Sequence, residues 1–101
     1  SFAIAALKSD FREKLRETEP DWVVRLVGVP SAAIHEFVVW ILEVVFHRSE
    51  VESVQIMLHV HNNGVGVAGV YPFDVAQAKV EKVLELAEQN EYPLLSTLEP
   101  E

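Results

Sequence analysis

The chain has no cysteine, which excludes disulfide bonds and zinc sites with cysteine ligands. It also has no run of about 20 apolar residues, the length that a membrane-spanning helix needs. No basic stretch followed by an apolar block stands near its first residue, so a secretion signal is not expected. These absences predict a soluble protein of the cytoplasm or of an organelle stroma, without a membrane partner.

Basic residues are also few. Eight Lys and Arg side chains stand against sixteen Asp and Glu, which gives a net charge of -8. A surface of this charge repels a phosphate backbone, so nucleic acid is not an expected partner. The 101 residues, half of them hydrophobic, are enough for one domain with one modest core. Small acidic domains of this kind more often bind other proteins.

Residues 1–19 are predicted to form an N-terminal helical extension. Leu7, Phe11 and Leu15 recur at four-residue steps, which is helical spacing, and Pro20 ends the pattern. An isolated helix of this length is only marginally stable in water. The extension is therefore expected to lie on the domain or on a second copy of the chain, with self-association as one outcome. A docking helix for another partner is the alternative.

Residues 21–101 are predicted to form one α+β domain with the order β-α-α-β-α-β. The expected elements are a strand at 21–29, helices at 34–46 and 50–62, a strand at 65–71, a helix at 73–89 and a strand at 94–99. Ser49 and Glu52 have the spacing of a capping box, and Gly64 supplies a helix end. Three strands are too few for a barrel, so we expect one sheet with the helices on one face. The helix at 34–46 is apolar on nearly all sides, so it is expected either to lie at the centre of the core or to have a second apolar face that something else covers. An exposed apolar surface, as a site of self-association, is the outcome that the second alternative allows.

No spacing in the sequence indicates catalysis or metal binding. His59 and His61 are two residues apart on a helix and point in different directions. His35 and His61 are expected to approach each other, but no carboxylate completes a zinc site with them. The glycines at 64 and 66 precede a strand, whereas a phosphate-binding loop follows one. We therefore expect neither an enzyme nor a cofactor or metal site.

Five motifs stand in a fixed order along the domain. They are Glu36-Phe37-Val38-Val39, Gln55-Ile56-Met57-Leu58 with Val60-His61, Gly69-Val70-Tyr71, Val75-Ala76 with Lys79-Val80, and Tyr92-Pro93-Leu94-Leu95-Ser96-Thr97-Leu98-Glu99. In this order and spacing they resemble the ClpS family, small adaptors that deliver substrates with destabilising N-terminal residues to the Clp AAA+ protease. The resemblance implies an α/β sandwich, a fold shared with the C-terminal domain of the ribosomal stalk protein. The helix with Met57, Val60 and His61 favours ClpS over the stalk family.

The resemblance also implies a pocket for the N-terminal residue of a substrate, the N-degron. In the family, an apolar pocket receives a Leu, Phe, Tyr or Trp side chain, and a histidine with an Asn-Asp-Asp turn binds the α-ammonium. By position, the pocket residues here are Val29, Ser31, Ala33, His35, Val38, Met57, Val60, His61 and Leu94. His61 stands at the ammonium-binding histidine, His35 at a gating Met and Ala33 at a capping Thr.

The acidic turn of that pocket is absent from this chain. Val29, Pro30 and Ser31 stand in its place, and no Asn or Asp occurs between Asp21 and Asn62. An ammonium has three donors, and burying it without acceptors costs several kcal/mol. We therefore expect recognition of N-terminal residues to be weakened or altered.

The surface that faces the chaperone in the family is better preserved. By resemblance, Asp74 and Lys79 are the residues that contact the N-domain of a Clp AAA+ chaperone. The first functional hypothesis is therefore an adaptor that binds this chaperone and delivers protein substrates or modulates their delivery. The alternative is a protein-interaction or oligomerisation domain of the same fold without N-degron binding. A stalk-like domain that binds translation factors is a third possibility.

Overall fold

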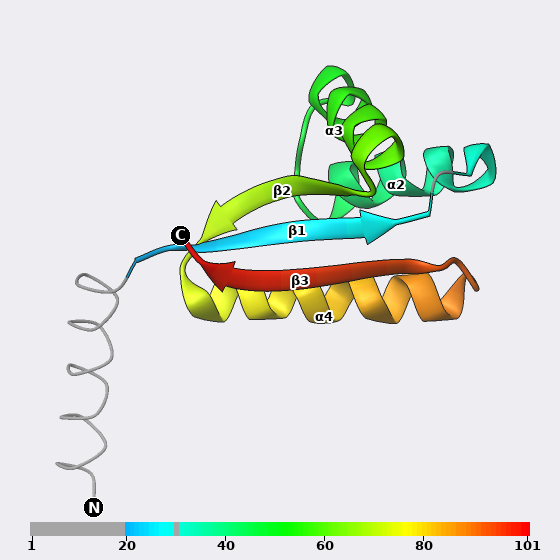
Figure 1. Cartoon of the computed structure of the whole chain (residues 1–101). Helices are drawn as coiled ribbons and strands as arrows, with labels where there is room; N and C mark the ends of the chain where they lie inside the picture. Colours follow the sequence, from blue (N-terminus) through cyan, green and yellow to red (C-terminus); the bar gives the residue numbers. More distant parts are fainter. Residues whose placement is uncertain (1–19, 30) are drawn as a thin grey trace, which may run out of the picture.

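The computed structural model describes residues 20–29 and 31–101. Its elements are β1 (Trp22–Gly28), the 3-10 turn η1 (Ala32–Ile34), α2 (His35–Val44), α3 (Glu50–Asn63), β2 (Val65–Tyr71), α4 (Phe73–Gln89) and β3 (Leu94–Pro100) (Figure 1). This order confirms the β-α-α-β-α-β prediction for the domain. The helical extension expected at 1–19 lies outside the described residues.

The three strands form one antiparallel sheet in the order β2-β1-β3. The first strand is therefore the central one, and the last strand of the chain lies beside it. Across the sheet, Val24 of β1 stands opposite Gly69 of β2 and Leu98 of β3. The predicted three-stranded sheet is confirmed.

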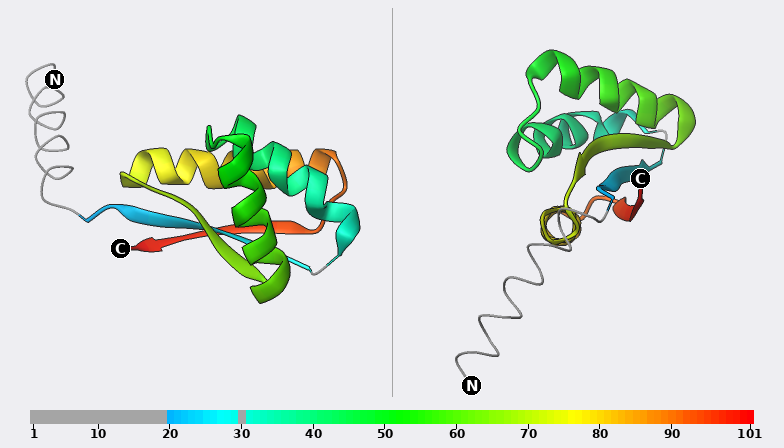
Figure 2. Two further views of the ribbon diagram at one scale, coloured as in Figure 1. Left: turned by 90° about the horizontal axis from the view of Figure 1, so that it is seen from above. Right: turned by 90° about the vertical axis from the view of Figure 1, so that its left-hand side faces the viewer.

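Burial alternates along the central strand. Val24 and Leu26 are fully buried, whereas their neighbours Val23, Arg25 and Val27 on the other face are half-buried. Because successive side chains of a strand point to opposite faces, this alternation shows that one face of the sheet carries the core. On that face α4 runs along β3, and α3 packs against β2 (Figures 1 and 2). The predicted placement of the helices on one face is confirmed.

Helix α2 is apolar on nearly all sides, and only part of it reaches the core. Its buried residues are Phe37, Val38, Ile41 and Leu42. Trp40 and Val44, on the other side, are each 44% exposed. The exposed apolar surface that the sequence allows is therefore present on α2. The helix is shorter than the expected 34–46, because the chain turns sharply at His47, which has a positive φ of 53°.

The ends of α3 follow the sequence signals. The Ser49 hydroxyl accepts a hydrogen bond from the Glu52 amide at 3.2 Å, and the Glu52 carboxylate accepts one from the Ser49 amide at 3.3 Å. The helix closes at Gly64, whose φ of 80° is in the left-handed region that glycine adopts without a steric penalty. The capping box and the glycine stop are both confirmed, with the helix end one residue beyond the prediction.

The capping box makes the stability of the domain depend on pH. The hydrogen bonds from the Ser49 backbone and side chain lower the pKa of Glu52 below its usual 4.5. A lowered pKa in the folded state gives stability that is present above the unfolded pKa and lost as the pH falls through the folded one. Glu52→Gln is therefore expected to reduce the fall in melting temperature between about pH 5 and about pH 3. Glu50→Gln, outside the box, is the control, and equal slopes for Glu52→Gln and the unchanged chain would contradict the prediction.

Close packing of α3 on β2 depends on Gly66. A Cβ atom at this position would lie 2.8 Å from Cγ2 of the buried Val60. Gly66→Ala is therefore expected to destabilise the domain by about 1 to 3 kcal/mol, the cost of an overpacked core. Adding Val60→Ala should relieve the contact, so the double variant should lose less than the sum of the two single losses in urea unfolding. A strictly additive result would exclude this clash as the cause.

Candidate functional site

Two histidines meet where α2 begins and α3 ends. Nε2 of His35 lies 2.9 Å from Nδ1 of His61, and the two rings stand edge to face with centroids 4.5 Å apart. Both side chains are half-buried. The expected approach of His35 and His61 is therefore confirmed.

The hydrogen bond between these rings limits what they offer to a ligand. One proton is shared along it, from His35 to His61 or in the reverse direction. In a neutral pair, one of the two outward ring nitrogens then carries a proton, and the other can accept a hydrogen bond. The outward Nε2 of His61 is an acceptor only when its Nδ1 donates to His35. The pair thus presents one acceptor to a ligand. That acceptor lies on His61 when His61 donates to His35, and on His35 when the hydrogen bond runs in the reverse direction.

The aliphatic residues expected to line the N-degron pocket belong to the core. Val38, Val60 and Leu94 are 1%, 3% and 2% exposed. Val60 and Leu94 both lie against Gly28, at the end of β1. Met57 is half-buried and lines a shallow hollow of about 280 Å³. The other residues of this hollow are His35, Glu36, Val39, Trp40 and Glu43.

The turn after β1 offers few acceptors. The Ser31 amide donates to the Val29 carbonyl at 2.8 Å, which occupies one of the few polar groups there. The Val29 side chain is exposed, as is Ala33 in η1. Neither side chain has an oxygen atom. Among Val29, Ser31 and Ala33, the Ser31 hydroxyl is therefore the one polar side-chain group.

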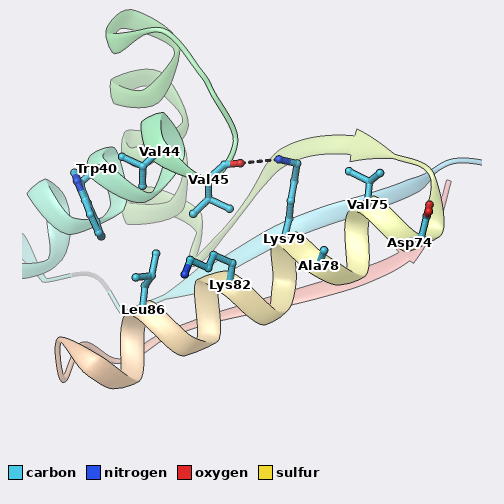
Figure 3. Close-up of a pocket in the computed structure, with 9 residues that line it drawn as sticks. All are labelled: Trp40, Val44, Val45, Asp74, Val75, Ala78, Lys79, Lys82 and Leu86. Atoms are coloured by element: carbon cyan, nitrogen blue, oxygen red, sulfur yellow. Dashed lines mark hydrogen bonds between the residues drawn. The ribbon is translucent and has the colours of Figure 1, made fainter.

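A larger groove lies between α2 and α4, and we call it the α2–α4 groove (Figure 3). Its volume is about 570 Å³. It is lined by Trp40, Val44, Val45, Asp74, Val75, Ala78, Lys79, Lys82 and Leu86. Of this set, the sequence identified only Asp74 and Lys79 as candidate site residues. The α2 residues of the groove could have been suspected, because α2 is apolar on nearly all sides. That pattern does not indicate which other helix lies opposite them.

Lys79 holds one wall of the groove in place. Its Nζ donates to the Val45 carbonyl at 2.6 Å, which ties α4 to the end of α2 (Figure 3). The same ammonium lies 5.0 Å from the centroid of the Tyr71 ring. Burial raises the pKa of the Tyr71 hydroxyl. Lys82, by contrast, is 53% exposed and lies 3.7 Å from Glu85, so it is the more accessible cation of the groove.

Residues 20–29 and 31–101 contain neither a metal-binding cluster nor a membrane-spanning helix. No group of three or more His, Asp or Glu side chains in these ranges is arranged to hold a metal ion. None of the described helices combines the length and apolar character needed to cross a membrane.

Known proteins match both the sequence and the fold. The family model for the ATP-dependent Clp protease adaptor protein ClpS matches residues 33–97. The ClpS adapter protein of Myxococcus xanthus is 59% identical over 66 residues, which cover 65% of this chain and 62% of that protein. The ClpS adapter protein of Caulobacter vibrioides strain NA1000 is 50% identical over 64 residues, 63% of this chain and 59% of that protein.

Among solved structures, that of Agrobacterium tumefaciens ClpS2 bound to L-phenylalaninamide is similar, with a TM-score of 0.75 and 30% sequence identity. The likeness covers 82% of this chain and 99% of that one. The chain spans about three-fifths of the length of the curated relatives, at 62% and 59%. The relatives are named adapters, which agrees with the expectation of a non-enzyme. The motifs, the fold and these matches together show that the chain belongs to the ClpS family of Clp protease adaptors.

Proposed function

We propose that this chain is an adaptor of the cytoplasm or an organelle stroma that binds the N-domain of a Clp AAA+ chaperone. In this proposal it delivers protein substrates, or modulates their delivery, with weakened or altered recognition of their N-terminal residues. Membership of the ClpS family carries the first part of the proposal. The hydrogen bond between His35 and His61 carries the second.

The α2–α4 groove supports binding of a chaperone. Asp74 and Lys79, which match the chaperone-contacting positions of the family, both line it. Trp40, Val44 and Val75 add exposed apolar area to the same surface. An apolar centre with charged groups at its margin is the usual composition of a protein interface. Because the Lys79 ammonium donates a hydrogen bond to the Val45 carbonyl, it also holds α4 and the end of α2 in position at this surface.

Counting acceptors supports weakened recognition of an N-terminal amine. An α-ammonium presents three donors. His61 offers one acceptor at most, and only when its Nδ1 donates to His35. The turn at 29–31 offers the Ser31 hydroxyl and backbone carbonyls. The Val29 carbonyl already accepts from the Ser31 amide, and the Ser31 carbonyl accepts from the Ile34 amide. Apolar burial of one large side chain is worth about 1.5 to 3 kcal/mol, which does not by itself offset the entropy lost on association.

The test of the proposed function is binding of the full chain to isolated N-domains of Clp AAA+ chaperones, measured by calorimetry. We expect saturable binding in the micromolar range, about -8 kcal/mol. An N-domain from a AAA+ protein outside the Clp group serves as the control. If no Clp N-domain binds at high protein concentration, the adaptor function is wrong and an interaction domain without a chaperone partner is favoured.

A further inference from the structure

The α2–α4 groove is a large apolar surface for a domain of this size. Trp40 and Val44 of α2 are each 44% exposed, and Val75 of α4 is 39% exposed. Exposed apolar residues that gather in one groove are typical of a docking site. Between Asp74 and Leu86 the groove follows α4 for 12 residues, or about 18 Å. An occupant of matching length is an amphipathic helix of about three turns.

Charged side chains stand on both sides of the groove. On the α4 side, Lys79 and Lys82 line it, and Asp74 lies at one end. On the α2 side, the exposed Glu43 lies outside the groove lining, with Trp40 at the neighbouring hollow. A helix that fits this groove should therefore have an apolar stripe with acidic residues along one flank and basic residues along the other.

The segment before the domain has this pattern in its sequence. Leu7, Phe11 and Leu15 share one face of a helix drawn through them. One flank of this helix would carry the acidic residues Asp10, Glu13 and Glu17, and the other the basic residues Lys8, Arg12 and Arg16. The stripe from Leu7 to Leu15 is about 12 Å long, which fits within the groove.

The segment also joins the domain at the correct end of the groove. The Trp22 ring at the start of β1 packs on Phe73, with ring centroids 4.9 Å apart. Phe73 directly precedes Asp74, which lies at one end of the groove, while Trp40 and Leu86 lie toward the other (Figure 3). Pro20 is therefore close to the Asp74 end. A tether of a few residues gives an effective concentration in the millimolar range, which makes even a weak helix dock.

We propose that residues 7–17 form a helix that occupies the α2–α4 groove of the same chain, antiparallel to α4. The family model matches only from residue 33, so this segment lies outside the part of the chain that the ClpS match covers. Docking covers Asp74 and Lys79. If these residues contact the chaperone, as proposed above, the segment is an internal competitor that must leave the groove before the adaptor binds.

Because the chain has no cysteine, engineered cysteine pairs test the docking directly and without a chaperone. The antiparallel arrangement places Leu15 near Val75 and Leu7 near Leu86. We expect Leu15→Cys with Val75→Cys, and Leu7→Cys with Leu86→Cys, to form intramolecular disulfides under mild oxidation. The exchanged pairs, Leu7→Cys with Val75→Cys and Leu15→Cys with Leu86→Cys, use the same positions and should form at least tenfold less.

Equal yields from matched and exchanged pairs would overturn the proposal, as would disulfides that link two chains. Intermolecular links would place a second copy in the groove. Quenching of Trp40 fluorescence by acrylamide, in a Trp22→Phe background, gives a second measurement without a cross-link. Leu7→Glu with Phe11→Glu should increase the quenching constant about twofold or more, whereas no change would overturn the docking. Failure of the chaperone to bind would leave these results intact and contradict only the proposed function.

Discussion

A variant with Val29→Asn, Pro30→Asp and Ser31→Asp is expected to bind a peptide that begins with phenylalanine at least about tenfold more tightly than the unchanged chain. The substitutions place carboxylate and amide oxygens at the positions of the family's acidic turn. A hydrogen bond to a charged group is worth about 1.5 to 3 kcal/mol, and 1.4 kcal/mol is a factor of ten in affinity. Fluorescence anisotropy with a labelled peptide measures the gain.

Two controls separate recognition of the N-terminal amine from nonspecific binding of the peptide. The same peptide with an acetylated N-terminus should show no gain, because it has no ammonium. A variant with Ala at all three positions removes Val29, Pro30 and Ser31 without adding acceptors, and it should bind like the unchanged chain. If the unchanged chain already binds the free peptide tightly and loses it on acetylation, other atoms have replaced the acidic turn, and the proposed weakening of the site is wrong.

Charge reversal at the two groove lysines is expected to separate folding from binding. Lys79→Glu removes a charged donor from the Val45 carbonyl and sets a carboxylate against that oxygen. We expect it to lower the free energy of unfolding by about 1.5 to 3 kcal/mol. Lys82→Glu removes only an exposed contact with Glu85, so its effect on stability should stay within about 0.5 kcal/mol.

Both reversals are expected to weaken binding of a Clp N-domain, since both change the charge of the groove. Urea unfolding gives the stability, and calorimetry with the folded protein gives the affinity. Lys79→Met serves as a third variant because it keeps an apolar stem of similar length while it removes the hydrogen bond. Equal stability of Lys79→Glu and Lys82→Glu would contradict the role assigned to the bond between Lys79 and Val45.

The sequence by itself determined the order and most bounds of the elements, because their signals are local. The capping box of Ser49 and Glu52, the stop at Gly64 and the apolar period of α4 each act within a few residues. The strand at 65–71 and the helix at 73–89 were predicted with the bounds that the structure has. The end of α2 was not, because the turn at His47 leaves no signal in the apolar pattern.

The tertiary structure alone decided how the site residues are arranged. The positions of His35 and His61 on two helices suggested that they meet, but only the fold shows their ring nitrogens 2.9 Å apart, and with that the loss of an acceptor. The α2–α4 groove brings together residues of two helices that are far apart in the sequence. The hydrogen bond from Lys79 to Val45 joins residues 34 positions apart. Such contacts depend on how two helices pack across the sheet, which no local pattern specifies. The sequence therefore determines which residues are available, and the placement of α2 and α4 on either side of the groove determines which of them form a surface.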